Sequence, residues 1–281
     1  RGCPAGRMVQ GDLMAQVFVR TSPLGALALC ISLLASPLGA HEVWIDALRW
    51  QVAPSQPISA NLRNGQVFEG IRLPWLPKRL RQAVVQTGGT VRDMEGRAGD
   101  LPAFAVETDA PGLVVLGYES QPSTLTYTDY PKFASFAEEK GHAAVIADAP
   151  QEARPREAYT RHAKALIGVG DAQGADQALG FEIELVAETN PYTAPKDPMQ
   201  VRLIYQDAAL AETRVTLFDK DPEGAVTVST MTTNAEGRVR FDTAPGHVYL
   251  VDAVMLRPAT DAMAPDVSWE SLWASLTFAV P

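Results

Sequence analysis

Cysteine is almost absent from this sequence of 281 residues. Its two cysteines are Cys3 and Cys30, and none follows. Residues 31–281 therefore form no disulfide within their own length, and they offer neither a thiolate metal site nor a cysteine nucleophile. This part of the chain must derive its stability from a hydrophobic core.

A hydrophobic run long enough to span a membrane is also missing. The apolar run at 24–34 is shorter than the ~18 residues that a spanning helix needs. Arg20 precedes it and small residues follow it up to Ala40, which is the order of a secretory signal peptide. Because residue 1 is Arg, we expect residues 1–40 to be a signal peptide with an upstream extension. The mature chain would then be a periplasmic protein that begins at His41.

Positive charge is scarce as well. The 24 Lys and Arg are outnumbered by 33 Asp and Glu, for a net charge of -9. Loss of residues 1–40 removes three Arg and one Asp, which takes the charge to about -11 (-9 - 3 + 1). Such a balance disfavours nucleic acid and anionic membranes. We therefore expect no nucleic-acid partner and no stable membrane insertion of the mature chain.

The common catalytic signatures are absent from the sequence. There is no G-x-S-x-G elbow, no H-E-x-x-H, no P-loop and no G-x-G-x-x-G. We therefore predict that the protein is not an enzyme.

Short segments of alternating apolar and polar residues recur through most of the chain. Residues 41–45, 58–62 and 181–185 are examples, and Asn64-Gly65 predicts a hairpin turn. The alternation at 181–185 places Glu182 and Glu184 on the solvent face of a strand. Frequent turn signals between such segments are typical of a β-sandwich.

The middle of the chain differs in character. Helical spacing predicts a helix over Lys132–Lys140, with a solvated end, and a second helix over Arg156–Ile167. The small and polar residues of Gly168–Gly180 predict a linker. We therefore predict a mainly β protein with two immunoglobulin-like or transthyretin-like β-sandwich domains, 41–170 and 181–281, and a short helical segment between them.

An N-terminal histidine would be a ready metal ligand. The α-amino group and the imidazole Nδ1 of His41 could close one chelate ring on Cu(II) or Ni(II). Glu42 is an adjacent carboxylate. The other histidines are His142, His162 and His247. We predict that His142 is an exposed loop residue, that His162 is a hydrogen-bonded core residue, and that any of the three could complete a site.

Five segments carry a resemblance to a known family. The first segment reads H-E-V-W-I and the last reads W-E-S-L-W-A-S-L-T-F. In order, the five are His41–Ile45, Pro155–Leu166, Glu184 with Asn190-Pro191-Tyr192, Thr233–Phe241 and Trp269–Phe278. The chain resembles a bacterial periplasmic family of unknown function that includes nickel-uptake accessory (NikK-like) proteins.

The resemblance implies a periplasmic role in the uptake of nickel or cobalt, with His41 as the first ligand. It also implies a membrane metal transporter or an outer-membrane receptor as partner. Two alternatives stay open. One is a copper oxidase with a histidine brace, which requires a second histidine. The other is a structural or protein-binding β-sandwich module without metal.

Overall fold

The computed structural model describes residues 2, 41–108, 110–260 and 266–281. The predicted signal peptide lies outside the described residues apart from residue 2. Strands dominate the described chain and helices are few, which confirms the prediction of a mainly β, sandwich-like protein. None of the helices in these ranges is long and apolar enough to cross a membrane.

The strands form three sheets. The β1 sheet has the order β1-β3-β4, with β7 beside β3, and its strands are β1 (Glu42–Ala47), β3 (Ile58–Gln66), β4 (Glu69–Leu73) and β7 (Phe104–Val106). The β12 sheet has the order β11-β12-β13, with β16 beside β12, and its strands are β11 (Ile183–Ala187), β12 (Met199–Tyr205), β13 (Ala208–Ala209) and β16 (Arg238–Phe241).

The central sheet contains 10 strands in the order β15-β14-β17-β18-β10-β8-β5-β6, with β2 and β9 pairing β10. Its strands are β2 (Gln51–Val52), β5 (Leu80–Thr87), β6 (Thr90–Asp93), β8 (Gly112–Ser120), β9 (Ser123–Thr126), β10 (Arg156–Val169), β14 (Arg214–Lys220), β15 (Val226–Thr232), β17 (Val248–Pro258) and β18 (Trp269–Ala279). A single turn of 3-10 helix, Pro77–Arg79, precedes β5.

The central sheet is covered on both faces. Val114 of β8 and Ala165 of β10 enter the hydrophobic core shared with the β1 sheet. Their neighbours Val115 and Leu166 enter the core shared with the β12 sheet. Because successive side chains of a strand point to opposite faces, the central sheet is the middle of three layers.

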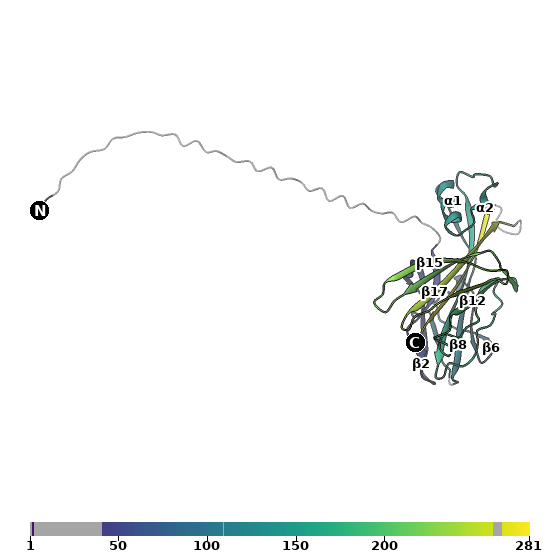
Figure 1. Ribbon diagram of the computed structural model, residues 1–281. Helices are drawn as coiled ribbons and strands as arrows, with labels where there is room; N and C mark the ends of the chain where they lie inside the picture. Colours follow the sequence, from purple (N-terminus) through teal and green to yellow (C-terminus); the bar gives the residue numbers. More distant parts are fainter. Residues whose placement is uncertain (1, 3–40, 109, 261–265) are drawn as a thin grey trace. The chain divides into compact units, whose positions relative to one another are not determined.

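Two helices cover one end of the central sheet (Figure 1). They are α1 (Tyr130–Glu139) and α2 (Ala143–Ile146). The Asp129 side chain caps α1 by accepting a hydrogen bond from the Lys132 amide at 3.0 Å. Phe133 and Phe136 of α1 pack on the indole rings of β18. The first predicted helix is thus confirmed, with bounds shifted by one or two residues.

The predicted domain boundary at Gly168–Gly180 falls inside one compact unit, Pro37–Pro281. The central sheet takes β5, β8 and β10 from the first predicted domain, and β14, β17 and β18 from the second. β10 and β18 run parallel to each other as neighbours. Both hydrophobic cores therefore contain side chains of the central sheet.

The second predicted helix is wrong, because residues 156–169 form the strand β10. This strand pairs with β18 on one side and with β8 and β9 on the other, and most of its side chains are buried. Charged residues at 157, 161 and 164 are buried too. A strand buried on both faces loses its alternating pattern, so its apolar residues can fall at helical spacing by chance.

The first hairpin turns three residues later than Asn64-Gly65 predicted. Its turn residues are Val67 and Phe68, with φ values of 50° and 61°. Positive φ at both positions is the type I′ geometry, which favours Asn-Gly and strains a β-branched residue. Gly65 serves another purpose, because a Cβ there would overlap the backbone of Glu69.

Phe68 compensates for part of this strain. Its ring is 3% exposed and packs edge-on against Trp44 at 5.6 Å between ring centroids. The Nζ of Lys220 donates to the Phe68 carbonyl at 3.0 Å and lies 4.3 Å from the ring centre. Val67, in contrast, is 50% exposed. The buried residue therefore holds the turn, and the exposed one adds backbone strain without packing in the core.

Replacing Val67 with Asn should stabilise the protein. Asn tolerates the left-handed conformation, so Val67→Asn should raise the free energy of unfolding by about 1 kcal/mol, measured by urea denaturation. Val67→Ala, which has no such preference, should gain less. An unchanged or lower stability for Val67→Asn would show that the turn is not strained.

Candidate functional site

His41 lies directly before β1 and is half-buried. Its neighbour Glu42 begins the strand and is only 5% exposed. The Oε1 of Glu42 accepts a hydrogen bond from the Nζ of Lys140 at 2.8 Å. Glu42 therefore belongs to an internal ion pair, in which an ammonium group engages its Oε1.

Lys140 directly follows α1 as its C-terminal cap, and it too is buried. Its Nζ lies 3.6 Å from Oδ2 of Asp252 on β17 and 4.8 Å from the ring centre of Trp273 on β18. One ammonium group thus serves two buried carboxylates. The predicted solvated helix end is wrong for Lys140, because its charge is paired inside the protein.

This cluster shifts the pKa of two of its groups. Burial raises the pKa of Asp252 to about 7, against the attraction of Lys140. Burial alone would lower the pKa of Lys140, but the charges of Asp252 and Glu42 outweigh it and raise that pKa. Near neutral pH the cluster therefore carries a lysine cation and a carboxyl group poised to exchange a proton.

Arg161 of β10 extends the buried cluster. Its guanidinium lies 3.8 Å from the ring centre of Trp273 and 4.9 Å from that of Tyr159. Burial lowers the pKa of Arg161, and the negative charge of Glu157 opposes this. Glu157 in turn accepts hydrogen bonds from the hydroxyls of Tyr127 and Ser271. Ring stacking thus covers the Arg161 guanidinium, whose Nε and Nη1 are buried without a hydrogen-bond partner, while hydrogen bonds satisfy Glu157.

A hollow of about 300 Å³ lies beside this cluster. Its lining includes Glu42 and Lys140 on one side and residues of β14 and β15 on the other, namely Thr216, Phe218, Val228 and Thr230. The start of β1 therefore borders both a buried ion pair and an open space.

The other histidines lie on separate elements. His142 follows α1, is half-buried rather than exposed, and its Nε2 is 2.7 Å from the carbonyl of Val254. His162 is 3% exposed and its Nδ1 is 3.0 Å from the carbonyl of Trp273, which confirms it as a core residue. His247 has its Nδ1 2.6 Å from Asp219. Each has one ring nitrogen already paired.

Within the described ranges, no group of three or more His, Cys, Asp or Glu residues could hold a metal ion. The predicted ligands Glu42, His142, His162 and His247 thus form no such group with His41. The amine and imidazole of His41 do not depend on one, because a two-donor chelate can be completed by water.

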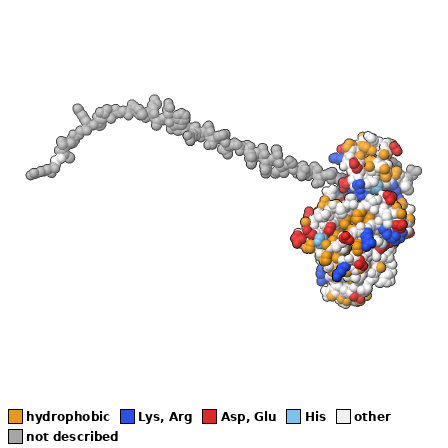
Figure 2. All heavy atoms as spheres, in the orientation of Figure 1, with side chains coloured by type: hydrophobic (Ala, Val, Ile, Leu, Met, Phe, Trp, Pro, Cys, Tyr) orange, Lys and Arg blue, Asp and Glu red, His pale blue; other side chains and the backbone are white. Residues whose placement is uncertain are grey.

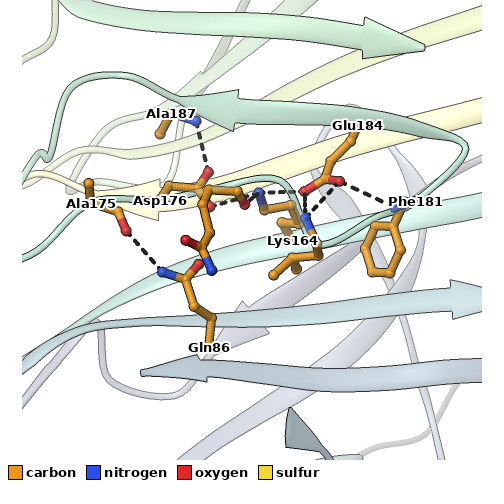
Figure 3. A network of polar contacts seen from close by, with 9 residues as sticks. Gln86, Lys164, Ala175, Asp176, Phe181, Glu184 and Ala187 are labelled. Carbon is orange, nitrogen blue, oxygen red and sulfur yellow. Dashed lines mark hydrogen bonds and ion pairs between the residues drawn. The ribbon is translucent and has the colours of Figure 1, made fainter. Parts of the chain in front are cut away.

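A second buried network surrounds Lys164 of β10 (Figure 3). Its Nζ lies 2.7 Å from Asp176 and 2.8 Å from Glu184, and all three side chains are at most 1% exposed. Glu184 also accepts from the amides of Leu179 and Phe181. The predicted solvent position of Glu184 is therefore wrong.

The Lys164 network also fixes most of the segment Gly168–Gly180, which the sequence predicted to be a linker. Asp176 accepts a hydrogen bond from the Ala187 amide at 2.8 Å, and the Gln177 carbonyl accepts one from Lys164 at 3.0 Å. Asn190 donates to the carbonyls of Ala172 and Gly174. These contacts hold the segment 171–180 against β10. The segment is therefore a loop fixed to the fold by hydrogen bonds and not a free linker. The members of the Lys164 network pair with one another, so the network has a structural role.

Sequence reasoning missed both buried networks. Lys140, Lys164 and Asp252 look like ordinary surface charges, and their partners are far away in the sequence. One signal was available at Lys164, which stands in a run with Ala163, Ala165 and Leu166. A lone charge in an apolar run indicates a buried, paired residue when the run is a strand.

The layered sheets define a mainly β, sandwich-like protein. Residues 38–257 match the family described as "Domain of unknown function (DUF4198)". The chain belongs to this family, which confirms the expected membership of a family of unknown function. No curated protein matches the chain.

Three solved structures are similar to the chain. A tetra-tandem repeat in the extending region of a large adhesion protein has 13% identity and a TM-score of 0.21, with 85% of this chain and 49% of that chain covered. The D0-D1 domain of Intimin has 14% identity, a TM-score of 0.19 and coverages of 84% and 97%. A DUF3823 family protein from Bacteroides uniformis has 9% identity, a TM-score of 0.20 and coverages of 86% and 100%.

The chain spans about half the length of the adhesion-protein structure, at 49%. With TM-scores between 0.19 and 0.21, we draw no functional argument from these likenesses.

Removing the amino group of Lys164 should destabilise the protein strongly. Lys164→Met leaves Asp176 and Glu184 buried without a cation, so we expect a loss of about 3–5 kcal/mol in the free energy of unfolding, measured with urea. Lys196→Met, at an exposed position, should change it little. Adding Asp176→Asn and Glu184→Gln to Lys164→Met should restore part of the loss. Equal stability of the two Met variants would contradict a closed ionic network.

Asp252 should make the protein less stable as pH rises. Its pKa is about 7 in the folded protein, against an ordinary aspartate value of 3.8. Between these values the folded protein holds a proton that the unfolded chain has released, so the Asp252 contribution decreases from about pH 4 to about pH 7 and is constant above.

Asp252→Asn removes this titration. Relative to the parent, the variant should therefore gain stability between about pH 4 and pH 7, measured by urea denaturation across that range. Asp93→Asn, at an exposed position of β6, serves as the control and should run parallel to the parent. A constant difference between Asp252→Asn and the parent would show that Asp252 is already ionised at low pH.

Proposed function

We propose that the mature protein is an exported, non-enzymatic accessory protein that binds a transition-metal ion through His41. The ion is nickel, cobalt or copper, and its recipient is a membrane transporter or an outer-membrane receptor. The observation that carries the proposal is the position of His41, half-buried at the start of β1. Cleavage after Ala40 would add a free amine to the imidazole of this residue.

The ion pair next to His41 supports such a role. Glu42 is fixed by the 2.8 Å contact with Lys140, and Val43 accepts a hydrogen bond from the Ser275 hydroxyl at 2.7 Å. The two residues that follow His41 are therefore immobilised, Glu42 by the end of α1 and Val43 by β18 of the central sheet. A terminal residue anchored in this way loses less conformational freedom when it chelates a metal.

The small number of donor atoms at His41 favours transfer of the metal ion to a partner over its storage. An amine and an imidazole fill two positions of a metal ion and leave the rest to water or to a partner's ligands. A site of this kind binds an ion that a second protein can remove by adding ligands. The resemblance to a family with nickel-uptake accessory members agrees with this role, and it names the class of partner.

The proposal can be tested on the exported protein by intact mass spectrometry. The mature mass should correspond to a chain that begins at His41. One equivalent of Ni(II) or Cu(II) should then bind under native conditions, because a chelate of amine and imidazole binds more tightly than the two water ligands that it displaces. A variant with one extra Ala before His41 should lose this binding, since its amine and imidazole no longer close the same ring.

His247→Ala is the matched control, because this imidazole is paired with Asp219 and should not contribute. A mature chain that begins elsewhere would remove the basis of the proposal. Binding that is absent, or unaffected by the extra Ala, would favour a β-sandwich module without a metal role.

A further inference from the structure

One edge of the central sheet is open. β15 pairs with β14 on one side, and within the described ranges no strand pairs with its other side. Figure 1 shows it at the margin of the fold. It is 7 residues long with the sequence V-T-V-S-T-M-T, and five of these residues are exposed. Its backbone groups along the free edge can therefore pair with another strand.

The opposite edge of the same sheet is protected in the usual ways. β6 is only 4 residues long and contains Arg92 and Asp93. Short length and charged side chains both discourage edge-to-edge pairing. β15 has neither feature, and it has no proline. The contrast within one sheet indicates that the β15 edge is available for pairing.

The hollow beside Glu42 lies on one face of this edge. Phe218 and Val228 stand opposite each other across β14 and β15, as do Thr216 and Thr230, and these four residues line the hollow. A strand added to β15 would direct every second side chain to the same face. Those side chains would therefore enter or cover the hollow.

Exposed apolar groups border the hollow. Val228 is 46% exposed and Val67, at the strained hairpin turn, is 50% exposed. Strained backbone persists where surrounding structure holds it, and it concentrates at binding sites. Here the strain keeps an apolar side chain at the rim of a cavity of about 300 Å³.

The charges of the lining select among occupants. Glu42 and Lys140 neutralise each other at 2.8 Å. Glu139 lies 3.8 Å from the same Nζ with a side chain 72% exposed, and it carries the surplus negative charge. The chain as a whole has a net charge of -9. A second copy would repel the first, and its own β15 offers only Val and Thr side chains to this face. A separate, basic segment with larger apolar side chains is a better match.

We propose that β15 and the adjoining hollow form a docking groove for an extended segment of another protein, which adds to the central sheet as a strand. The segment has apolar side chains at alternate positions and a Lys or Arg that pairs with Glu139. Main-chain hydrogen bonds along β15 supply affinity, and the hollow supplies side-chain selectivity. This groove does not depend on metal binding by His41.

The test begins with a phage-displayed library of random dodecapeptides selected on the exported protein. Enriched peptides should show apolar residues at every second position and at least one Lys or Arg. A fluorescent copy of an enriched peptide should bind the parent protein, measured by anisotropy. Hydrogen exchange should show slower exchange of the β15 amides in the presence of the peptide, because an added strand takes up their hydrogen bonds.

Variants separate the groove from other surfaces. Val228→Lys puts a charge on the free edge, and Val67→Asn removes the apolar rim while relieving backbone strain, so both should remain folded. Each should weaken peptide binding by about tenfold. Val91→Lys, on the opposite edge strand β6, is the matched control and should leave binding unchanged.

Several results would overturn the proposal. These are a selection without enrichment, peptides that bind Val228→Lys as tightly as the parent, or protection of β6 in place of β15. A parent protein that is dimeric, and that becomes monomeric in Val228→Lys, would assign the edge to a second copy instead. None of these results depends on metal, so they are distinguishable from a failure of the His41 site.

Discussion

The central constraint on this fold is that β10 is buried on both faces although it carries charged side chains. Lys164 points to the side of the β12 sheet, where it lies 2.8 Å from Glu184. Arg161 points to the other side, where it stacks on Trp273 at 3.8 Å. A buried charge is tolerated only when it is paired or stacked. The neighbours of β10 must therefore bring partners to it, and this requirement shapes both outer layers.

Each partner comes from an element that would otherwise be loosely attached. On one side, Asp176 and Glu184 bring the loop 171–180 and β11 against β10. On the other side, Lys140 and Glu42 bring the end of α1 and the start of β1 towards Asp252 and Arg161. Polar and charged contacts thus decide which segment covers which part of the sheet. The apolar cores supply most of the stability, but they specify less strictly which segment lies against which part of the sheet.

Patterns in the sequence predict much of the fold but little of the candidate site. Alternation at 41–45 and 58–62 correctly predicts β1 and part of β3, and the spacing at 132–140 predicts α1. The prediction fails at β10, because a strand buried on both faces has no alternation and its apolar residues fall at helical spacing. It fails at Lys140 and Glu184 because side chains expected in solvent are paired in the interior. Pairing between distant residues is a property of tertiary structure, and no local pattern reports it.

The resemblance segments have a structural meaning that their spacing alone does not reveal. Glu184 pairs with Lys164, and Tyr192 donates to the carbonyl of Leu166 at 2.6 Å. Trp273 carries the cation of Arg161 on its ring. These motif residues build the framework around β10 and do not converge on a ligand. His41 differs from them, because it is half-buried at the rim of the fold.

The charges on the visible face of the protein are not gathered into one patch. Acidic, basic and hydrophobic side chains are intermixed over the face shown in Figure 2. Diffuse charge of this kind gives little selectivity on its own. The selectivity of the proposed sites must come from particular places, such as His41 or the open edge at β15.

The ion pair of Glu42 and Lys140 connects these two places. A buried ion pair contributes little net stability compared with apolar residues of the same size, because its attraction mainly offsets the loss of hydration. What it does supply is position: it fixes the start of β1 against the end of α1. We infer that the ion pair serves to fix this position. It holds His41 at the rim of the fold, and it forms one wall of the groove beside β15.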